Sequence, residues 1–235
     1  MSARDIDKRA LPAGRTDAPP PSTDLLSTID GMKPVRTRSR FGALALVAMA
    51  GLVTPAVVLA HHPYRPDLAS LPLAWVIAAA ALWAAASVSA LSAALVPRPG
   101  QVLPAPRHAS RVAVRVLLAL AAFVLAASVH VEGGSLRPED AHLTLLQSCV
   151  HCATVVLEIA APFLFAGVYA LRRLVPDGRA RIGLGLGAAG GAMGGFVLHF
   201  ICGFAGTAHV LIGHVGGTIL AAAAGAALLP ALLRP

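Results

Sequence analysis

The chain has 235 residues, 57% of them apolar and 13% charged, with a net charge of +8 and a mean hydropathy of +0.73. This apolar fraction exceeds that of soluble domains and indicates an integral membrane protein. The apolar residues fall in runs of about twenty, which excludes a membrane β-barrel, because barrel strands alternate in polarity over about ten residues.

The first forty residues precede the first apolar run and are rich in proline, arginine and aspartate. Within this tail, residues 22–32 place capping residues before apolar side chains at positions 25, 26, 29 and 32, which predicts a short amphipathic helix. Such a short helix is only marginally stable alone in water, so its apolar face is expected to pack against lipid or protein. Asp24 and Asp30 disfavour docking on lipid, which leaves a protein partner or a passive juxtamembrane helix as the alternatives.

Six apolar runs follow, each long enough to cross the bilayer core as an α-helix. We place these predicted spans at residues 41–60, 72–96, 112–131, 152–171, 181–203 and 208–233. The predicted fold class is all-α, a polytopic membrane protein with six transmembrane helices. Residues 41–235 are expected to form the transmembrane domain and residues 1–40 its tail.

Lysines and arginines lie almost entirely on one side of the predicted membrane. Eight occur in residues 1–40, four in each of the segments 97–115 and 172–181, and one at Arg234, whereas the opposite loops carry only Arg65 and Arg137. By the positive-inside rule, both termini are cytoplasmic. The positive charge therefore reflects topology and contact with anionic membrane lipids. No basic stripe with interleaved aromatic residues indicates direct binding of nucleic acid.

The last two spans carry stripes of small residues. A glycine occurs at every fourth residue from Gly183 to Gly195, and the next step on that stripe is His199. The sixth span repeats the pattern from His209 to Gly225. Because glycine stripes permit close contact between helices, we expect these spans to pack together and to bring His199 near His209.

Thiols and imidazoles gather at the predicted outer face, which holds eight of the nine histidines and all three cysteines. Cys149, His151 and Cys152 stand where a polar loop gives way to the fourth span, and His199 and Cys202 lie near the outer end of the fifth. These two spans run in opposite directions, so both clusters are expected to meet at one membrane face.

This chemistry suits a transition-metal ion such as Zn or Cu, because thiolate and imidazole groups are its preferred ligands. The candidate metal ligands are His151, His199, His209, Cys152 and Cys202. The cysteines could instead form a disulfide in an oxidising compartment. The excess of histidines favours metal binding over a disulfide, and the metal ion would be the signal that the protein senses.

An enzyme is not expected, because no Ser-His-Asp arrangement, phosphate-binding loop or His-Glu-x-x-His pair is visible. A transporter would carry more intramembrane charge than the single Glu158 of the fourth span. The alternative from a different class is a histidine-rich membrane oxidoreductase subunit that binds haem or copper.

Several features carry a resemblance to a known family. They are Leu25-Leu26 and Lys33-Pro34-Val35-Arg36 before the first span, Cys152 and Pro162 in the fourth, Arg172-Arg173 after it, Leu198-His199 and Cys202 in the fifth, and His209 in the sixth. In order and spacing, over residues 24–234, the chain resembles the NrsF-like membrane anti-sigma factors. Its organisation is also similar to that of the CarR anti-sigma protein.

The resemblance implies a protein of the bacterial inner membrane whose cytoplasmic segment 22–36 holds an ECF-class sigma factor inactive. The residues that would bind the sigma factor are Leu25, Leu26, Ile29, Met32, Pro34, Val35 and Arg36. The resemblance also implies that two outer cysteines, here Cys152 and Cys202, are needed to respond to a metal, oxidative or photo-oxidative stress. Cys149 goes beyond the family pattern and is a third candidate for sensing.

Overall fold

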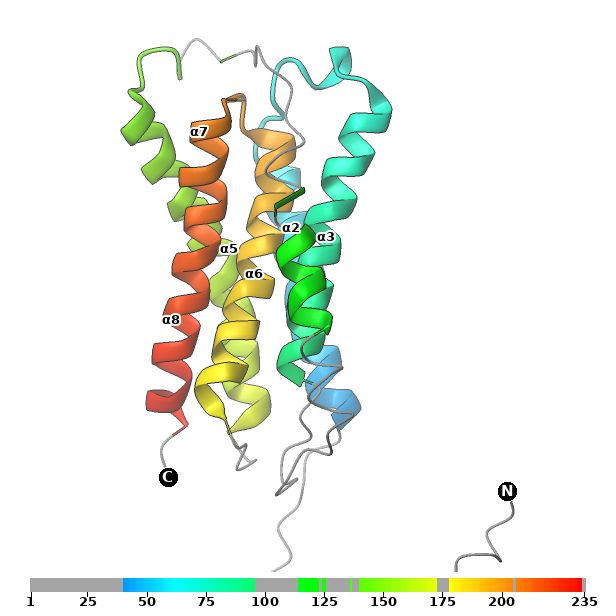
Figure 1. Cartoon of the computed structure of the whole chain (residues 1–235), viewed down its shortest axis with the longest axis vertical. Helices are drawn as coiled ribbons and strands as arrows, with labels where there is room; N and C mark the ends of the chain where they lie inside the picture. Colours follow the sequence, from blue (N-terminus) through cyan, green and yellow to red (C-terminus); the bar gives the residue numbers. More distant parts are fainter. Residues whose placement is uncertain are drawn as a thin grey trace, which may run out of the picture. The chain divides into compact units, whose positions relative to one another are not determined.

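Helix α6 (Arg179–Ile201) forms the centre of a helix bundle (Figure 1). Helices α3, α5 and α8 pack against it, and 72% of its most apolar stretch is buried, against 28% to 50% in the other three long helices. Glycine and alanine dominate its sequence, so it presents little side-chain volume and its neighbours can approach closely on several sides.

The computed structural model describes residues 40–95, 114–122, 124–125, 136, 140–172, 178–204 and 206–233. The predicted sigma-binding segment 22–36 lies outside these residues. All the described residues belong to one unit, residues 37–235.

All the regular secondary structure in the part of the chain that the structure describes is helical, which confirms the all-α prediction. Besides α6, its long helices are α2 (Arg40–His61), α3 (Leu73–Leu95), α5 (Leu145–Leu171) and α8 (Gly216–Leu232). Residues 114–122 and 124–125 are also helical. The shorter elements are the 3-10 helix η1 (Leu68–Ser70), α7 (Thr207–His209) and the π-helix η2 (Val210–Val215), which runs on into α8.

Four of the predicted spans coincide with helices that are long and apolar enough to cross a membrane: Leu73–Leu95, Leu145–Leu171, Arg179–Ile201 and Thr207–Leu232. The first predicted span falls on α2, whose described apolar part is the shorter Ala45–His61. The third is described only at residues 114–122 and 124–125. The count of six therefore stays a prediction.

Helix α5 begins seven residues before the fourth predicted span, at Leu145 rather than at residue 152. The Thr144 hydroxyl accepts a hydrogen bond from the Gln147 backbone N–H, and the Gln147 side chain accepts one from the Thr144 backbone N–H. This capping box satisfies backbone donors at the helix start, so the polar residues there extend the helix. Cys149 and Cys152 consequently lie on a helix and not in a loop.

The predicted close packing of the last two spans is confirmed for one half of each helix. A Cβ atom on Gly183 would lie 2.0 Å from the Gly225 carbonyl oxygen, and one on Gly187 would lie 2.1 Å from the Ala221 carbonyl oxygen. Further along the stripe, Gly195 meets the Trp83 ring of α3 instead. The stripes separate because two crossing helices touch over only part of their length.

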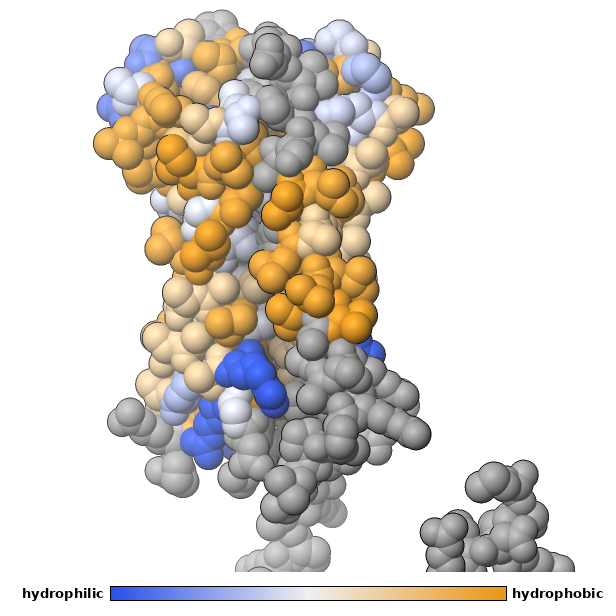
Figure 2. Space-filling model, viewed as in Figure 1, coloured by the Kyte–Doolittle hydropathy of each residue, from blue (hydrophilic) through white to orange (hydrophobic). Residues whose placement is uncertain are grey.

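The side chains around the outside of the bundle are apolar. Leu52, Val88, Phe165 and Ile219 come from four different helices and are 63% to 70% exposed. Figure 2 shows hydrophobic residues across the middle of the bundle and hydrophilic residues toward its ends. Exposure of such a large apolar surface to water is unfavourable, whereas contact with the hydrocarbon core of a bilayer is not. The structure therefore describes a membrane protein.

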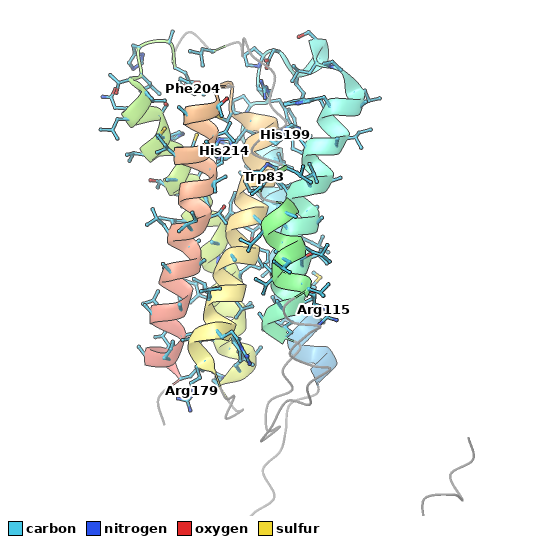
Figure 3. The ribbon with its side chains drawn as sticks, viewed as in Figure 1. Trp83, Arg115, Arg179, His199, Phe204 and His214 are labelled. Carbon is cyan, nitrogen blue, oxygen red and sulfur yellow. The ribbon has the colours of Figure 1, made fainter. Side chains whose placement is uncertain are left out.

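The two ends of the bundle differ in chemistry. Figure 3 places His199, Phe204 and His214 toward the end where α5 begins and α6 ends, which we call the cysteine end. Arg115 and Arg179 lie toward the opposite end, where the Arg179 guanidinium donates a 2.7 Å hydrogen bond to the Leu233 carbonyl. The positive-inside rule predicts that the cysteine end is periplasmic.

A topology reporter tests this orientation. A reporter active only in the periplasm should be active when fused after Pro66 or Glu139, and silent after Arg107 or Gly178. The physical reason is that arginine and lysine are retained on the cytoplasmic side during insertion. A second reporter, active only in the cytoplasm, should give the reverse pattern. Periplasmic activity after Gly178 would contradict the orientation.

Candidate functional site

Cys152 and Cys202 meet in the interior of the cysteine end. Their Sγ atoms lie 3.5 Å apart, and the two residues are 3% and 8% exposed. Cys152 lies on the second turn of α5, and Cys202 caps the end of α6. The two helices contact each other through α6 glycines, because a Cβ on Gly194 would lie 2.8 Å from the Val156 Cα. This contact brings the start of one helix beside the end of the other.

The imidazole of His209 lies between the Cys202 thiol and the start of α5, where Ser148 and Cys149 contact it. Its Nε2 lies 3.4 Å from Cys202 Sγ, while its Nδ1 lies 3.1 Å from Ser148 Oγ and 3.7 Å from Cys149 Sγ. The Phe204 ring stacks on it, with 4.9 Å between ring centroids. His209 is 2% exposed, so these contacts hold the ring in one place.

A π-helix brings a second histidine to the same place. In a regular α-helix, residues five apart such as His209 and His214 point about 140° away from each other. Residues 210–215 instead form the π-helix η2, in which residues about five apart share a face. The two rings consequently lie 5.3 Å apart, and His214 is 4% exposed.

Four buried ligand-type side chains therefore come together at the cysteine end: Cys152, Cys202, His209 and His214. Their ligand atoms all lie within 4.8 Å of one another. They come from three places in the sequence, the start of α5, the end of α6 and the α7–η2 segment. We call these four residues the Cys/His cluster.

A hollow of about 60 Å³ leads to the thiols from the surface. Cys152 and Cys202 line it together with the exposed His62 and His151 and the half-buried Asp140. A metal ion or a small oxidant could reach the cluster by this route, past side chains that can bind a cation.

Cys202 lies one residue beyond α6, beside the Cys152 thiol and the His209 imidazole. The hydrogen bond with Cys152 holds the pKa of the Cys202 thiol well below its usual value, and the hydrogen bond with His209 acts in the same direction, whereas burial opposes both. A thiolate is the form that binds metals and attacks oxidants.

The comparison with known families decides what kind of protein carries this cluster. Residues 29–234 match the family described as NrsF, negative regulator of sigma F. The chain belongs to the NrsF family. No curated protein and no solved structure matches it. The match covers most of the chain and all four residues of the Cys/His cluster, and it confirms the resemblance found in the sequence. A sigma factor is the partner that membership implies.

Two of the metal ligands predicted for this NrsF-family chain lie away from the Cys/His cluster. The imidazole of His199 packs on the Trp75 ring, and its Nε2 lies 3.1 Å from the Val76 carbonyl oxygen, so α3 holds it. His151 is exposed and reaches only the hollow beside the cluster. The expected meeting of His199 with His209 is therefore replaced by that of His214 with His209.

The other predicted ligands, Cys152, Cys202 and His209, are brought together, and Cys149 lies on the far side of the His209 ring. Their role in sensing stays a prediction. His214 was not predicted as a ligand, because the periodicity of a regular α-helix places it on a different face from His209. No residue pattern in the sequence predicts a π-helix at this position. The sigma-binding residues before Ile29 precede the segment that matches the NrsF family.

Proposed function

We propose that this NrsF-family protein is a membrane-bound anti-sigma factor of the bacterial inner membrane. Its cytoplasmic segment 22–36 sequesters an ECF-class sigma factor, and its periplasmic Cys/His cluster senses a metal, oxidative or photo-oxidative stress that triggers release. The observation that carries the proposal is the buried cluster, which joins three helices at one end of a chain whose family negatively regulates a sigma factor.

The cluster is suited to sensing because a reaction there links residues from separate helices of the bundle. A disulfide would bring the two Sγ atoms from 3.5 Å to about 2.05 Å, and a metal ion would insert between them. Cys152 lies on α5 and Cys202 directly follows α6, so a bond between the two thiols, direct or through a metal ion, ties the start of α5 to the end of α6. Tightly packed helices move as rigid bodies, which carries the displacement toward the opposite face.

Release requires two conformations with different affinities for the sigma factor. A shift from 99% bound to 99% free needs a difference of roughly 5.5 kcal/mol between them. One metal–thiolate or disulfide bond can supply a free energy of this order. A single buried cluster is therefore sufficient as the switch.

The sigma-binding segment gives the most direct test. Serine at Leu25, Ile29 and Met32 together should abolish retention of the sigma factor, because these side chains form the apolar face that the partner would cover. Membranes that contain the full-length variant would be used in a pull-down of the co-expressed sigma factor, with the amount of membrane-inserted variant matched to wild type.

The matched control removes side chains from the opposite face of the same predicted helix. Alanine at Ser27 and Asp30 should leave retention unchanged. Equal retention by the triple serine variant and the wild type would show that the sigma factor docks elsewhere.

A further inference from the structure

We infer that Cys152, Cys202, His209 and His214 form a closed tetrahedral site for Zn²⁺. As a binding site this inference depends only on the geometry of the Cys/His cluster. The use of the ion as a signal rests on the proposed function. Two thiolates and two imidazoles are a ligand set that Zn²⁺ takes in structural sites.

The distances fit a tetrahedral ion. Zinc binds thiolate sulfur at about 2.3 Å and imidazole nitrogen at about 2.0 Å, which separates the ligand atoms by roughly 3.3 to 3.8 Å. The Sγ atoms of Cys152 and Cys202 lie 3.5 Å apart, and Cys202 Sγ lies 3.4 Å from His209 Nε2. All the pairs, including those with His214, lie within 4.8 Å. Small side-chain rotations therefore close the site.

The hydrogen bonds around His209 direct its Nε2 lone pair into the cluster. The Ser148 hydroxyl donates to the Leu145 carbonyl at 2.9 Å, so its oxygen accepts from the Nδ1–H of His209 at 3.1 Å. A proton on Nδ1 leaves Nε2 bare, and Nε2 is the atom that faces Cys202. An outer partner of this kind is what orients metal-binding histidines in general.

The second imidazole has a nitrogen without a partner. His214 Nε2 is buried and has no hydrogen-bond partner of ordinary geometry among the described residues, and the Cys202 thiol is the side chain that interacts with this imidazole. The buried His199 differs, because its Nε2 is paired with the Val76 carbonyl oxygen. An unpaired buried nitrogen is unfavourable, and a metal ion would satisfy it. The π-helix η2 is what turns His214 toward the thiols.

Charge favours a divalent ion. Each thiol gives up its proton to solvent on binding, so two thiolates and two neutral imidazoles around Zn²⁺ have no net charge. A site without net charge is compatible with burial in an apolar surrounding, whereas a monovalent ion would leave one negative charge there. Cys149 is not a ligand, because its Sγ lies beside His209 Nδ1, on the other side of the ring.

The test is metal binding by the full-length protein in detergent, stripped with a chelator and titrated with Co²⁺ and then Zn²⁺. We expect one ion per chain, with the intense visible bands of tetrahedral cobalt and a thiolate-to-cobalt charge-transfer band, both lost as Zn²⁺ displaces Co²⁺. H214N removes a metal ligand and should weaken metal binding by more than about 100-fold. Loss of a residue that only hydrogen-bonds a ligand costs up to roughly 100-fold, so the larger loss identifies His214 as a ligand. H199N and C149S are the controls, and both should bind as the wild type does.

A second readout needs no variant. Zn²⁺ should protect Cys152 and Cys202 from alkylation during mild denaturation, whereas Cys149 should react equally with and without the ion; mass spectrometry of peptides reports each thiol. No tetrahedral cobalt spectrum in the wild type, wild-type affinity in H214N, or equal protection of all three thiols would overturn the site. The binding assays contain no sigma factor. Tight Zn²⁺ binding that leaves sigma-factor capture unchanged would therefore uphold the site and count against its proposed role as the signal.

Discussion

Serine at either Cys152 or Cys202 is expected to abolish stress-induced release of the sigma factor as completely as serine at both. The two Sγ atoms lie 3.5 Å apart in one buried cluster. Both metal binding by the cluster and formation of a disulfide need the two thiols together, so loss of either one removes the reaction. Residues that act as one unit give non-additive losses. Sequestration itself should persist, because segment 22–36 is separate in the chain from both cysteines.

The measurement is a transcriptional reporter driven by the sigma factor, in cells exposed to metals, oxidants or light. Cys149→Ser is the matched control, because Cys149, although a sensing candidate in the sequence, lies outside the Cys/His cluster. This substitution removes a buried thiol from the same end of α5, but one whose Sγ lies beside His209 Nδ1, and the variant should respond as the wild type does. Partial losses in the single variants that add up in the double variant would show that the cysteines act separately.

Gly187→Ala is expected to cause a large loss of stability, because it adds a methyl group where α6 touches the backbone of α8. The added Cβ would lie 2.1 Å from the Ala221 carbonyl oxygen and 2.9 Å from the Ala222 Cα. Both of these are backbone atoms, so no side chain can rotate away and α6 and α8 must separate. Overpacking costs up to about 3 kcal/mol, and we expect Gly187→Ala to reach that upper end.

Unfolding of the purified protein by SDS in mixed micelles would measure this loss as a lower midpoint. Gly216→Ala is the matched control, because it adds the same methyl group to α8 where only the Leu211 carbonyl oxygen lies near, at 3.6 Å. That variant should unfold as the wild type does. Equal midpoints for the two variants would mean that α6 and α8 are not held in close backbone contact.

The Cys/His cluster and the glycine contacts are two parts of one arrangement. The glycines bring α6 against α5 and α8, and the cluster occupies the end where these three segments converge. A reaction at the thiols therefore acts on helices whose backbones already touch. This is the physical reason why a small local change could reach the far end of the bundle.

The sequence by itself determined the four helices that are long and apolar enough to cross a membrane, α3, α5, α6 and the helix Thr207–Leu232 that ends in α8, because long apolar runs have few alternatives in a bilayer. It also determined that Cys152 and Cys202 would approach each other, since consecutive antiparallel helices share an end, and that α6 would pack closely on α8, since glycine spacing leaves room for a backbone. The start of α5 could also have been predicted, because Thr144 and Gln147 have the three-residue spacing of a capping box.

Only the tertiary structure decided which histidines join the thiols. His199 lies on the predicted stripe, but α3 supplies the Val76 carbonyl and the Trp75 ring that hold its imidazole elsewhere. His214 lies off the stripe, and the π-helix at Val210–Val215 turns it toward His209. A prediction from residue spacing assumes that each helix is a regular α-helix and that the two helices pack only against each other. A local change of helical pitch and a contact from a third helix both depend on how the whole bundle packs, so neither can be read from spacing alone.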